Sequence, residues 1–184
     1  MITLFHDHAS PGSAVAVLRL HALADEGLPV RIVGYQPMPM EVAIPPSLAV
    51  LEELERHRDQ ARALGLELRR PQRLPPTTGA HLVERLADEP PVARRFRELA
   101  YRALWEDGAD IADRDVLGEL ADRAGIARAM AVARLGDRVE VARTKQHLAA
   151  ARSAHIGGVP ALDVDGTLVS AFLPLDHLRE LAAL

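Results

Sequence analysis

The sequence predicts an α/β protein in which a βαβ half and a ββα half share one sheet, with a long helical segment inserted between them. Strand signals occur only near the two ends of the 184-residue chain, and about a hundred residues of helical periodicity separate them. Clusters of glycine and proline mark the junctions. We expect one domain built from residues 1–46 and 155–184 and a second, all-helical domain built from residues 47–154.

The first half begins with a strand at Ile2–His6, where apolar and polar residues alternate. Ser10 is a favourable N-cap, and Pro11 suits the first helical position because its missing N–H would have no partner there. Gly27 ends this helix, and Val30–Tyr35 is a second strand. A strand reached through a helix predicts a parallel, right-handed βαβ unit.

The middle of the chain is predicted to be helical between proline-rich breaks. Residues 36–46 hold four prolines and are expected to form a loop, and residues 71–76 form a second break. Glu52 and Glu53 fit the first turn of the helix that starts at Ser47, because acidic side chains favour a helix N-terminus. The expected helices are 47–64, 78–87, 92–106, 113–124 and about 127–154.

Strand signals return after Gly157-Gly158-Val159-Pro160. Ala161–Val164 and Thr167–Ser170 are joined by Asp165-Gly166, a pair that accepts the positive φ of a tight hairpin turn. A final helix is expected from Pro174 or Asp176 to Leu184. These elements complete the ββα half.

Composition excludes several classes of function. A net charge of -4 and a pI near 6.1 give no general attraction to nucleic acid or anionic membranes. No apolar stretch approaches the roughly 20 residues of a membrane span, and the N-terminus lacks the pattern of an export signal, so we expect a cytoplasmic protein. Zero cysteines exclude a disulfide or thiolate of the chain's own.

A metal and a dinucleotide are not predicted. His6 and His8 alternate on one strand, but no third ligand stands at a diagnostic spacing from them, so we expect no metal site. The loop before the first helix has one glycine and no G-x-G-x-x-G pattern, which argues against a bound dinucleotide.

The order of elements resembles the thioredoxin-like fold, and the helical insertion resembles the DsbA-like branch of that fold. Three local features support the resemblance. Ser10-Pro11-Gly12-Ser13 stands where the branch has Cys-Pro-x-Cys, Gly158-Val159-Pro160 is similar to its cis-proline segment, and Leu104–Ile126 is similar to a helix-loop-helix of its insertion. The stretch SAFLPLDHL looks nearer to the disulfide oxidoreductases of the branch.

Two enzyme groups in this branch look like Ser-Pro-x-Ser at that place: kappa-class glutathione transferases and 2-hydroxychromene-2-carboxylate isomerases. The resemblance implies that Ser10 is the catalytic residue and orients the thiolate of glutathione or another low-molecular-weight thiol. The kappa enzymes start their last helix with Ser-Asp, whereas this chain has Leu175-Asp176. The candidate substrate- or cofactor-binding residues are Pro11, Ser13, His8, Val159, Pro160, Asp176 and His81.

The chemistry expected of a serine there differs from that of a cysteine. A helix N-terminus stabilises a thiolate by about 0.3 to 1 kcal/mol, and a hydroxyl can donate a hydrogen bond to it. The reactions that suit this site are conjugation of a thiol or thiol-assisted isomerisation of a small molecule. The possible homodimer is suggested by the relatives.

Alternatives remain open at this point. Ser10 could be a plain N-cap, His8 and His81 could be structural, and Pro160 could be an ordinary trans proline. The chain could also be a degenerate oxidoreductase that binds a peptide or small ligand without catalysis, or its two serines could have been substituted for cysteines.

Overall fold

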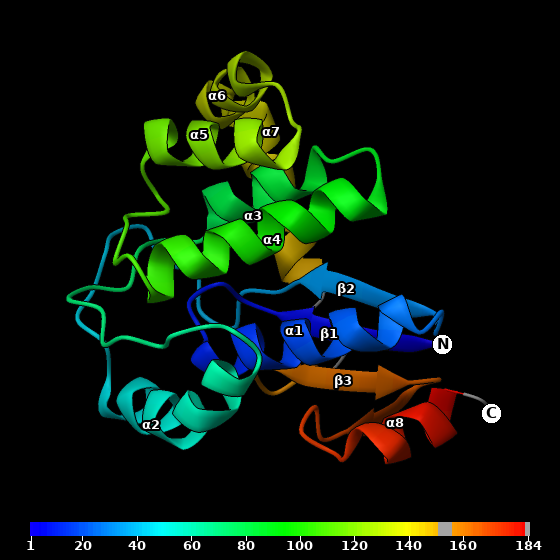
Figure 1. Ribbon diagram of the computed structural model, residues 1–184. Helices are drawn as coiled ribbons and strands as arrows, with labels where there is room; N and C mark the ends of the chain where they lie inside the picture. The colour runs from blue at the N-terminus through cyan, green and yellow to red at the C-terminus, as the bar shows by residue number, and fades with distance from the viewer. Residues whose placement is uncertain (151–155, 183–184) are drawn as a thin grey trace.

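A computed structural model describes residues 1–150 and 156–182 and contains one four-stranded sheet of order β2-β1-β3-β4 (Figure 1). β1 (Ile2–His6) pairs in parallel with β2 (Val30–Gly34) and antiparallel with β3 (Ala161–Val164). β4 (Thr167–Val169) extends the sheet beyond β3. The mixed α/β class with βαβ and ββα halves is therefore confirmed.

The sheet is covered by two helices that the sequence predicts from their caps and spacing. α1 (Pro11–Asp25) follows β1, and α8 (Leu175–Ala182) follows β4. α1 and α8 contact each other and lie in front of the sheet in Figure 1. Ile2 and Leu4 are fully buried on alternate positions of β1, which is the pattern expected of a strand with one face in the core.

Six helices occupy the middle of the chain. α3 and α4 lie between the sheet and the pair α5 and α6, and α7 packs against α3 and α6, whereas α2 lies apart from these and packs against α1 (Figure 1). His57 of α2 also stacks on Phe172, with ring centroids 4.2 Å apart. Their bounds are α2 Leu48–Ala63, α3 Thr78–Arg85, α4 Pro90–Trp105, α5 Arg114–Ala124, α6 Arg128–Gly136 and α7 Arg138–Ala150.

The helix expected over about residues 127–154 is in fact two helices. Asp137 is extended, with φ -82° and ψ 112°, and it separates α6 from α7. Its Oδ1 accepts the N–H groups of Val139 and Glu140 at 2.8 and 3.4 Å, as an N-cap does. The capping strength of aspartate outweighs the continuous helical pattern. The expected helical residues 151–154 and 183–184 lie outside the described residues.

Smaller boundary differences follow from local chemistry. α4 begins at Pro90 instead of residue 92, because proline is favourable in the first turn of a helix. β2 ends at Gly34, although the N–H of Tyr35 still donates to the carbonyl of His6 at 2.8 Å.

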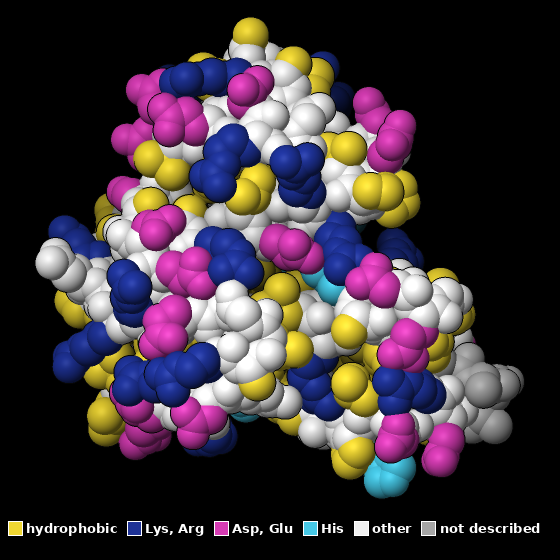
Figure 2. Space-filling model, viewed as in Figure 1, with side chains coloured by type: hydrophobic (Ala, Val, Ile, Leu, Met, Phe, Trp, Pro, Cys, Tyr) yellow, Lys and Arg dark blue, Asp and Glu magenta, His cyan; other side chains and the backbone are white. Residues whose placement is uncertain are grey.

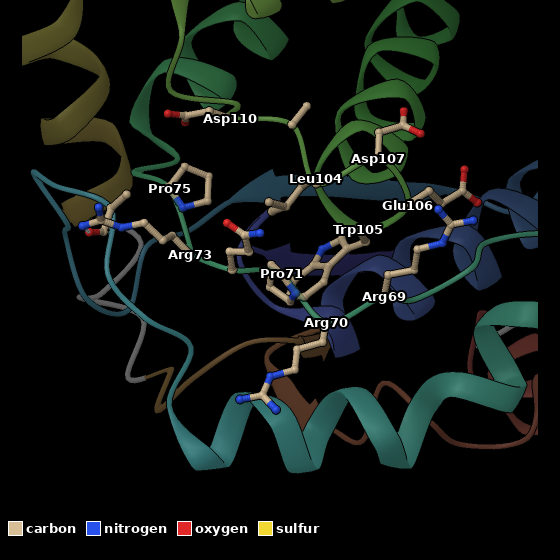
Figure 3. Close-up of a pocket in the computed structure, with 14 residues that line it drawn as sticks. Arg69, Arg70, Pro71, Arg73, Pro75, Leu104, Trp105, Glu106, Asp107 and Asp110 are labelled. Carbon is tan, nitrogen blue, oxygen red and sulfur yellow. Dashed lines mark hydrogen bonds between the residues drawn. The ribbon is translucent and has the colours of Figure 1, made fainter.

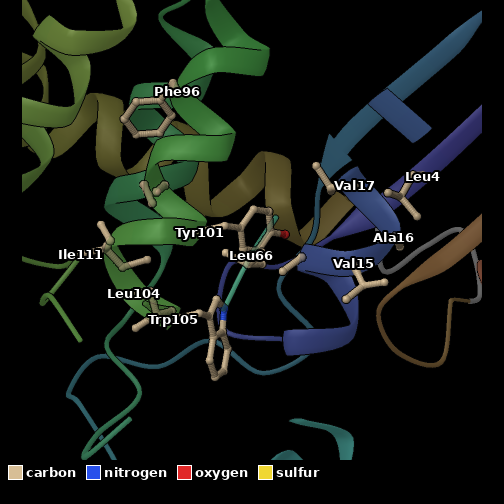
Figure 4. Packing of buried hydrophobic residues seen from close by; sticks show 14 of the residues in the cluster. Leu4, Val15, Ala16, Val17, Leu66, Phe96, Tyr101, Leu104, Trp105 and Ile111 are labelled. Atoms are coloured by element: carbon tan, nitrogen blue, oxygen red, sulfur yellow. The ribbon is translucent and has the colours of Figure 1, made fainter. Parts of the chain in front are cut away.

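The core joins α1 to the middle helices. The largest fully buried side chains include Phe96, Tyr101 and Trp105 of α4, and Figure 4 shows the last two reaching toward α1. Lys, Arg, Asp and Glu are interspersed over the face drawn in Figure 2. Among the described residues, no helix has the length and apolar character needed to cross a membrane.

Candidate functional site

The N-terminus of α1 is built as the sequence predicts. Ser10 is extended, with φ -104° and ψ 120°, and its Oγ accepts the N–H of Ser13 at 3.0 Å. Pro11 occupies the first turn, where its missing N–H removes one donor that would have no partner. Ser10 is 8% exposed, so little of its surface is open to a ligand.

A carboxylate from α2 already lies at this helix N-terminus. The Ser10 hydroxyl donates to Glu53 Oε1 at 3.3 Å, and the N–H of Gly12 also bonds this carboxylate. Burial raises the pKa of Glu53, and the bonds from Ser10 and Gly12 oppose that shift. The helix N-terminus therefore holds a partly buried anion.

The absence of a side chain at Gly12 allows the Glu53 carboxylate to come this close to α1. A Cβ at residue 12 would lie 2.3 Å from Glu53 Oε1 and 3.2 Å from Cδ of Pro160. The segment that ends in Pro160 thus lies beside the start of α1, as the predicted site requires. The Val159–Pro160 peptide bond is cis, and both residues are half-buried.

Ser13 faces the protein interior. It is fully buried, and its Oγ accepts the N–H of Asp7 at 3.3 Å. A further hydrogen bond joins it to the hydroxyl of Tyr101. In this structure, Ser13 connects α1 to the segment before it and to α4.

His8 and His81 meet in a buried cluster. We use the name histidine cluster for His6, His8, His81 and Glu84, whose ligand-type atoms all lie within 4.8 Å of one another. The Nε2 atoms of His6 and His8 are each 3.3 Å from Glu84 Oε2. Thus β1 and the turn after it supply two members, and one face of α3 supplies the other two.

Burial and charge set the protonation of this cluster. Burial lowers the pKa of His6 to about 3 and also lowers the pKa of His8. Burial opposes ionisation of Glu84, but Arg97, His6 and His8 together outweigh it and hold the pKa of Glu84 well below its usual range. Neutral His6 and His8 therefore face an ionised carboxylate.

Asp176 lies on the surface at the start of α8. Its side chain is 85% exposed and pairs with Arg179, which also forms hydrogen bonds with Glu26 of the α1 C-cap at 2.7 Å. Asp176 therefore takes part in a surface link between α8 and the end of α1.

Two pockets lie near these groups without opening onto Ser10. A pocket of about 520 Å³ lies between the proline-rich segment 69–75 and residues 104–110, and Trp105 lines it (Figure 3). Trp105 also donates its Nε1–H to the carbonyl of His8 at 3.1 Å. A second pocket, of about 210 Å³, is lined in part by His81, Glu84 and Arg97. Ser10 lines neither of these two pockets.

Sequence reasoning did not single out Glu53 or Glu84. Glu53 was explained as a favourable residue in the first turn of its own helix, but its side chain reaches α1 instead. Glu84 stands three residues after His81, the spacing that places two side chains on one helical face. That His-x-x-Glu spacing was the available signal for the second half of the histidine cluster.

Comparison with known proteins agrees with this architecture. The model of the DSBA-like thioredoxin domain matches residues 1–183. The chain belongs to this family. No curated protein matches the chain.

Solved structures of the same fold include proteins of different names. A protein named probable DsbA oxidoreductase, from Streptomyces coelicolor, is 21% identical with a TM-score of 0.81, and the match covers 99% of this chain and 88% of that one. A 2-hydroxychromene-2-carboxylate isomerase is 19% identical with a TM-score of 0.77, covering 99% and 92%. The cytosolic disulfide reductase DsbM from Pseudomonas aeruginosa with GSH is 18% identical with a TM-score of 0.64, covering 99% and 95%.

Proposed function

We propose that this member of the family is a thiol-assisted isomerase or transferase in which Ser10 orients the thiolate of a small thiol such as glutathione. The observation that carries the proposal is the anion at the start of α1, where a carboxylate is bonded by the Ser10 hydroxyl and the Gly12 N–H. A thiolate needs the same donors. The chain has no cysteine, so the sulfur must arrive with the ligand.

Glu53 supplies the proton acceptor in this proposal. The thiol S–H proton moves to the Glu53 carboxylate, and the sulfur that becomes negative takes over the hydrogen bonds from Ser10 and Gly12. The raised pKa of Glu53 favours this transfer, because it narrows the gap between the carboxyl and a thiol of pKa about 8.5. The neutral carboxyl then leaves the helix N-terminus to the thiolate.

Both reactions follow from the same first bond. The thiolate adds to one carbon of an electron-poor double bond, and the π electrons move onto the conjugated acceptor. In isomerisation the resulting single bond rotates, the C–S bond breaks and the thiolate leaves. In conjugation the C–S bond stays, and the proton held by Glu53 passes to the carbanion. Neither route changes the redox state of the protein.

The proposal specifies the class of the thiol, a low-molecular-weight thiol, and not one compound. Val159 is half-buried and directly precedes Pro160, which lies beside Gly12 of α1, and its backbone is the group we expect to pair with the peptide part of a ligand. Asp176, the expected contact for the γ-glutamyl end of glutathione, is bonded to Arg179 instead. Glutathione is therefore the first probe and not the assigned cofactor.

Calorimetry with glutathione tests the proposal. We expect millimolar glutathione to bind the wild type and Ser10→Ala to bind it about 10- to 150-fold more weakly, since a charge-assisted hydrogen bond contributes roughly 1.5 to 3 kcal/mol. Ser47→Ala is the matched control, because Ser47 caps α2 in the same way, accepting the N–H of Val50 at 3.3 Å. Absence of binding to the wild type, or equal loss in both variants, contradicts the proposal.

The second candidate is a binding module without catalysis. It is favoured by one observation: Glu53 fills the anion position and Ser10 is nearly buried. In that case the carboxylate serves as a permanent substitute for a ligand. Turnover separates the two candidates: glutathione-dependent addition to an electron-poor double bond that is lost in Ser10→Ala supports the enzyme, whereas ligand binding without such turnover supports a module for a peptide or small acid.

A further inference from the structure

The histidine cluster gathers four potential metal ligands inside the protein. The side chains of His6 and His8 are fully buried, and those of His81 and Glu84 are 2% and 9% exposed. The members come from two distant parts of the chain, the β1 end and α3. No group in the proposed thiol chemistry uses them.

The cluster also collects most of the unsatisfied buried polar atoms of the described residues. Of six such side-chain atoms, five belong to it: His6 Nε2, His8 Nδ1, His8 Nε2, His81 Nδ1 and Glu84 Oε2. A buried polar group without a partner costs about 1 to 3 kcal/mol. One ligand atom from each of the four residues lies within 4.8 Å of the others, which indicates a ligand that satisfies several of these groups together.

In two imidazoles of the cluster, one ring nitrogen is hydrogen-bonded to a residue outside the cluster. The other ring nitrogen is then left with a lone pair. When the Tyr101 hydroxyl donates to the carbonyl of Asp7, at 3.3 Å, it accepts from the Nδ1–H tautomer of His6 at 2.8 Å. The Asp7 carboxylate can only accept, so His81 Nε2, at 3.4 Å, carries the hydrogen. His6 Nε2 and His81 Nδ1 are left as acceptors, the arrangement found around metal-bound histidines.

The spacing fits a tetrahedral ion. Bonds of about 2.0 to 2.1 Å give about 3.3 Å between neighbouring ligand atoms and about 5.1 Å between the centres of two coordinated rings. The two imidazole contacts of Glu84 Oε2 are 3.3 Å. The centroids of the three imidazoles are 5.1, 5.2 and 4.8 Å apart.

We propose that His6, His8, His81 and Glu84 bind one divalent first-row transition metal ion, with Zn²⁺ the ion that fits best. Three imidazole nitrogens and one carboxylate oxygen are a donor set that zinc accepts. Arg97 bonds only Oε1 of Glu84, at 2.6 Å, which leaves Oε2 directed at the ion. Two buried carboxylates, Asp7 and Glu84, stand around this space, so a cation there is electrostatically favourable.

The ion would link β1 to α3 and has a route of entry. The 210 Å³ pocket lies against Gly34, His81 and Glu84. Four protein ligands and deep burial are typical of a structural site. The expected role is therefore to fix the segment that leads into Ser10, and it does not depend on thiol binding.

Metal analysis and calorimetry test the proposal on the full chain, free of any histidine tag and stripped with a chelator. We expect one Zn²⁺ per chain. His8→Ala should weaken binding at least about 100-fold, and Asp7→Asn should weaken it about 10- to 100-fold because Asp7 orients His81. His57→Ala is the matched control, since His57 is a buried histidine outside the cluster and should bind zinc as the wild type does.

Co²⁺ gives a second readout that needs no variant. One equivalent should produce the intense visible absorption of a tetrahedral site, and Zn²⁺ should abolish it. Absence of saturable binding by the wild type, a weak octahedral spectrum, or unchanged zinc affinity in His8→Ala would overturn the proposal. If His8→Ala does not fold, the cobalt spectrum of the wild type decides alone.

Discussion

Substitution of Gly34 by alanine probes how tightly the histidine cluster is packed. A Cβ at residue 34 would lie 2.5 Å from Nδ1 of His81 and 3.1 and 3.2 Å from two of its ring carbons. The ring of His81 is buried and faces Asp7 on its other side, so it has little room to retreat. Gly34 does not have a positive φ, and the added methyl group therefore acts through this contact and not through backbone strain.

The expected loss of stability can be worked from this contact. Overpacking a filled core costs about 1 to 3 kcal/mol. Alanine returns about 0.4 to 1 kcal/mol, because it restricts the unfolded chain more than glycine does. The mid-values of these two ranges leave a net loss of about 1.3 kcal/mol, or a fall in Tm of about 3 to 5 °C for a chain of this size.

Thermal and urea denaturation followed by far-ultraviolet circular dichroism measure this loss. Gly158→Ala is the control, because nothing lies within 4 Å of a Cβ there and its φ is not positive. Repeating Gly34→Ala in a His81→Ala background removes the ring and should remove the loss. An equal loss in both backgrounds would refute the contact with His81 as its cause.

Three other substitutions test the site around α1. Trp105→Phe leaves the carbonyl of His8 without its donor and should lower the free energy of unfolding by about 1 to 3 kcal/mol, measured by urea denaturation. Because burial raises the pKa of Glu53, its protonated form adds stability that is lost as pH rises through that pKa. The melting temperature of Glu53→Gln should therefore rise relative to that of the wild type as pH increases above the unfolded carboxyl pKa of about 4.3. Ser10→Cys with Ser13→Cys should oxidise a reduced dithiol faster when Glu53→Gln is added, because a neutral neighbour favours the thiolate.

Local chemistry made the start of the site predictable. The alternation of Ile2–His6, the cap at Ser10 and the proline at the first helical position each act within a few residues. They therefore placed β1 and the start of α1 correctly. The break at Asp137 was missed because helical periodicity and the capping strength of aspartate predict opposite structures there.

The long-range part of the site was beyond such signals. His8 and His81 are 73 positions apart in the numbering, and Ser10 and Glu53 are 43 apart. Each residue had an adequate local explanation, so nothing in the sequence required the pairs to meet. The proposed metal site needs ligands that do not stand near His6 in the sequence, and α3 brings His81 and Glu84 to it.

The segment from Asp7 to Ser10 is fixed by three helices at once. α4 bonds the carbonyls of Asp7 and His8, α3 bonds the Asp7 side chain, and α2 bonds the Ser10 hydroxyl. The two proposed sites therefore share this segment but no ligand atom. Removing zinc would weaken the contact between the segment from Asp7 to Ser10 and α3, and would thereby weaken thiol binding indirectly. A bound thiol would displace only the Glu53 carboxylate. A glutathione titration with and without zinc thus separates an ion that positions Ser10 from one that is unconnected with it.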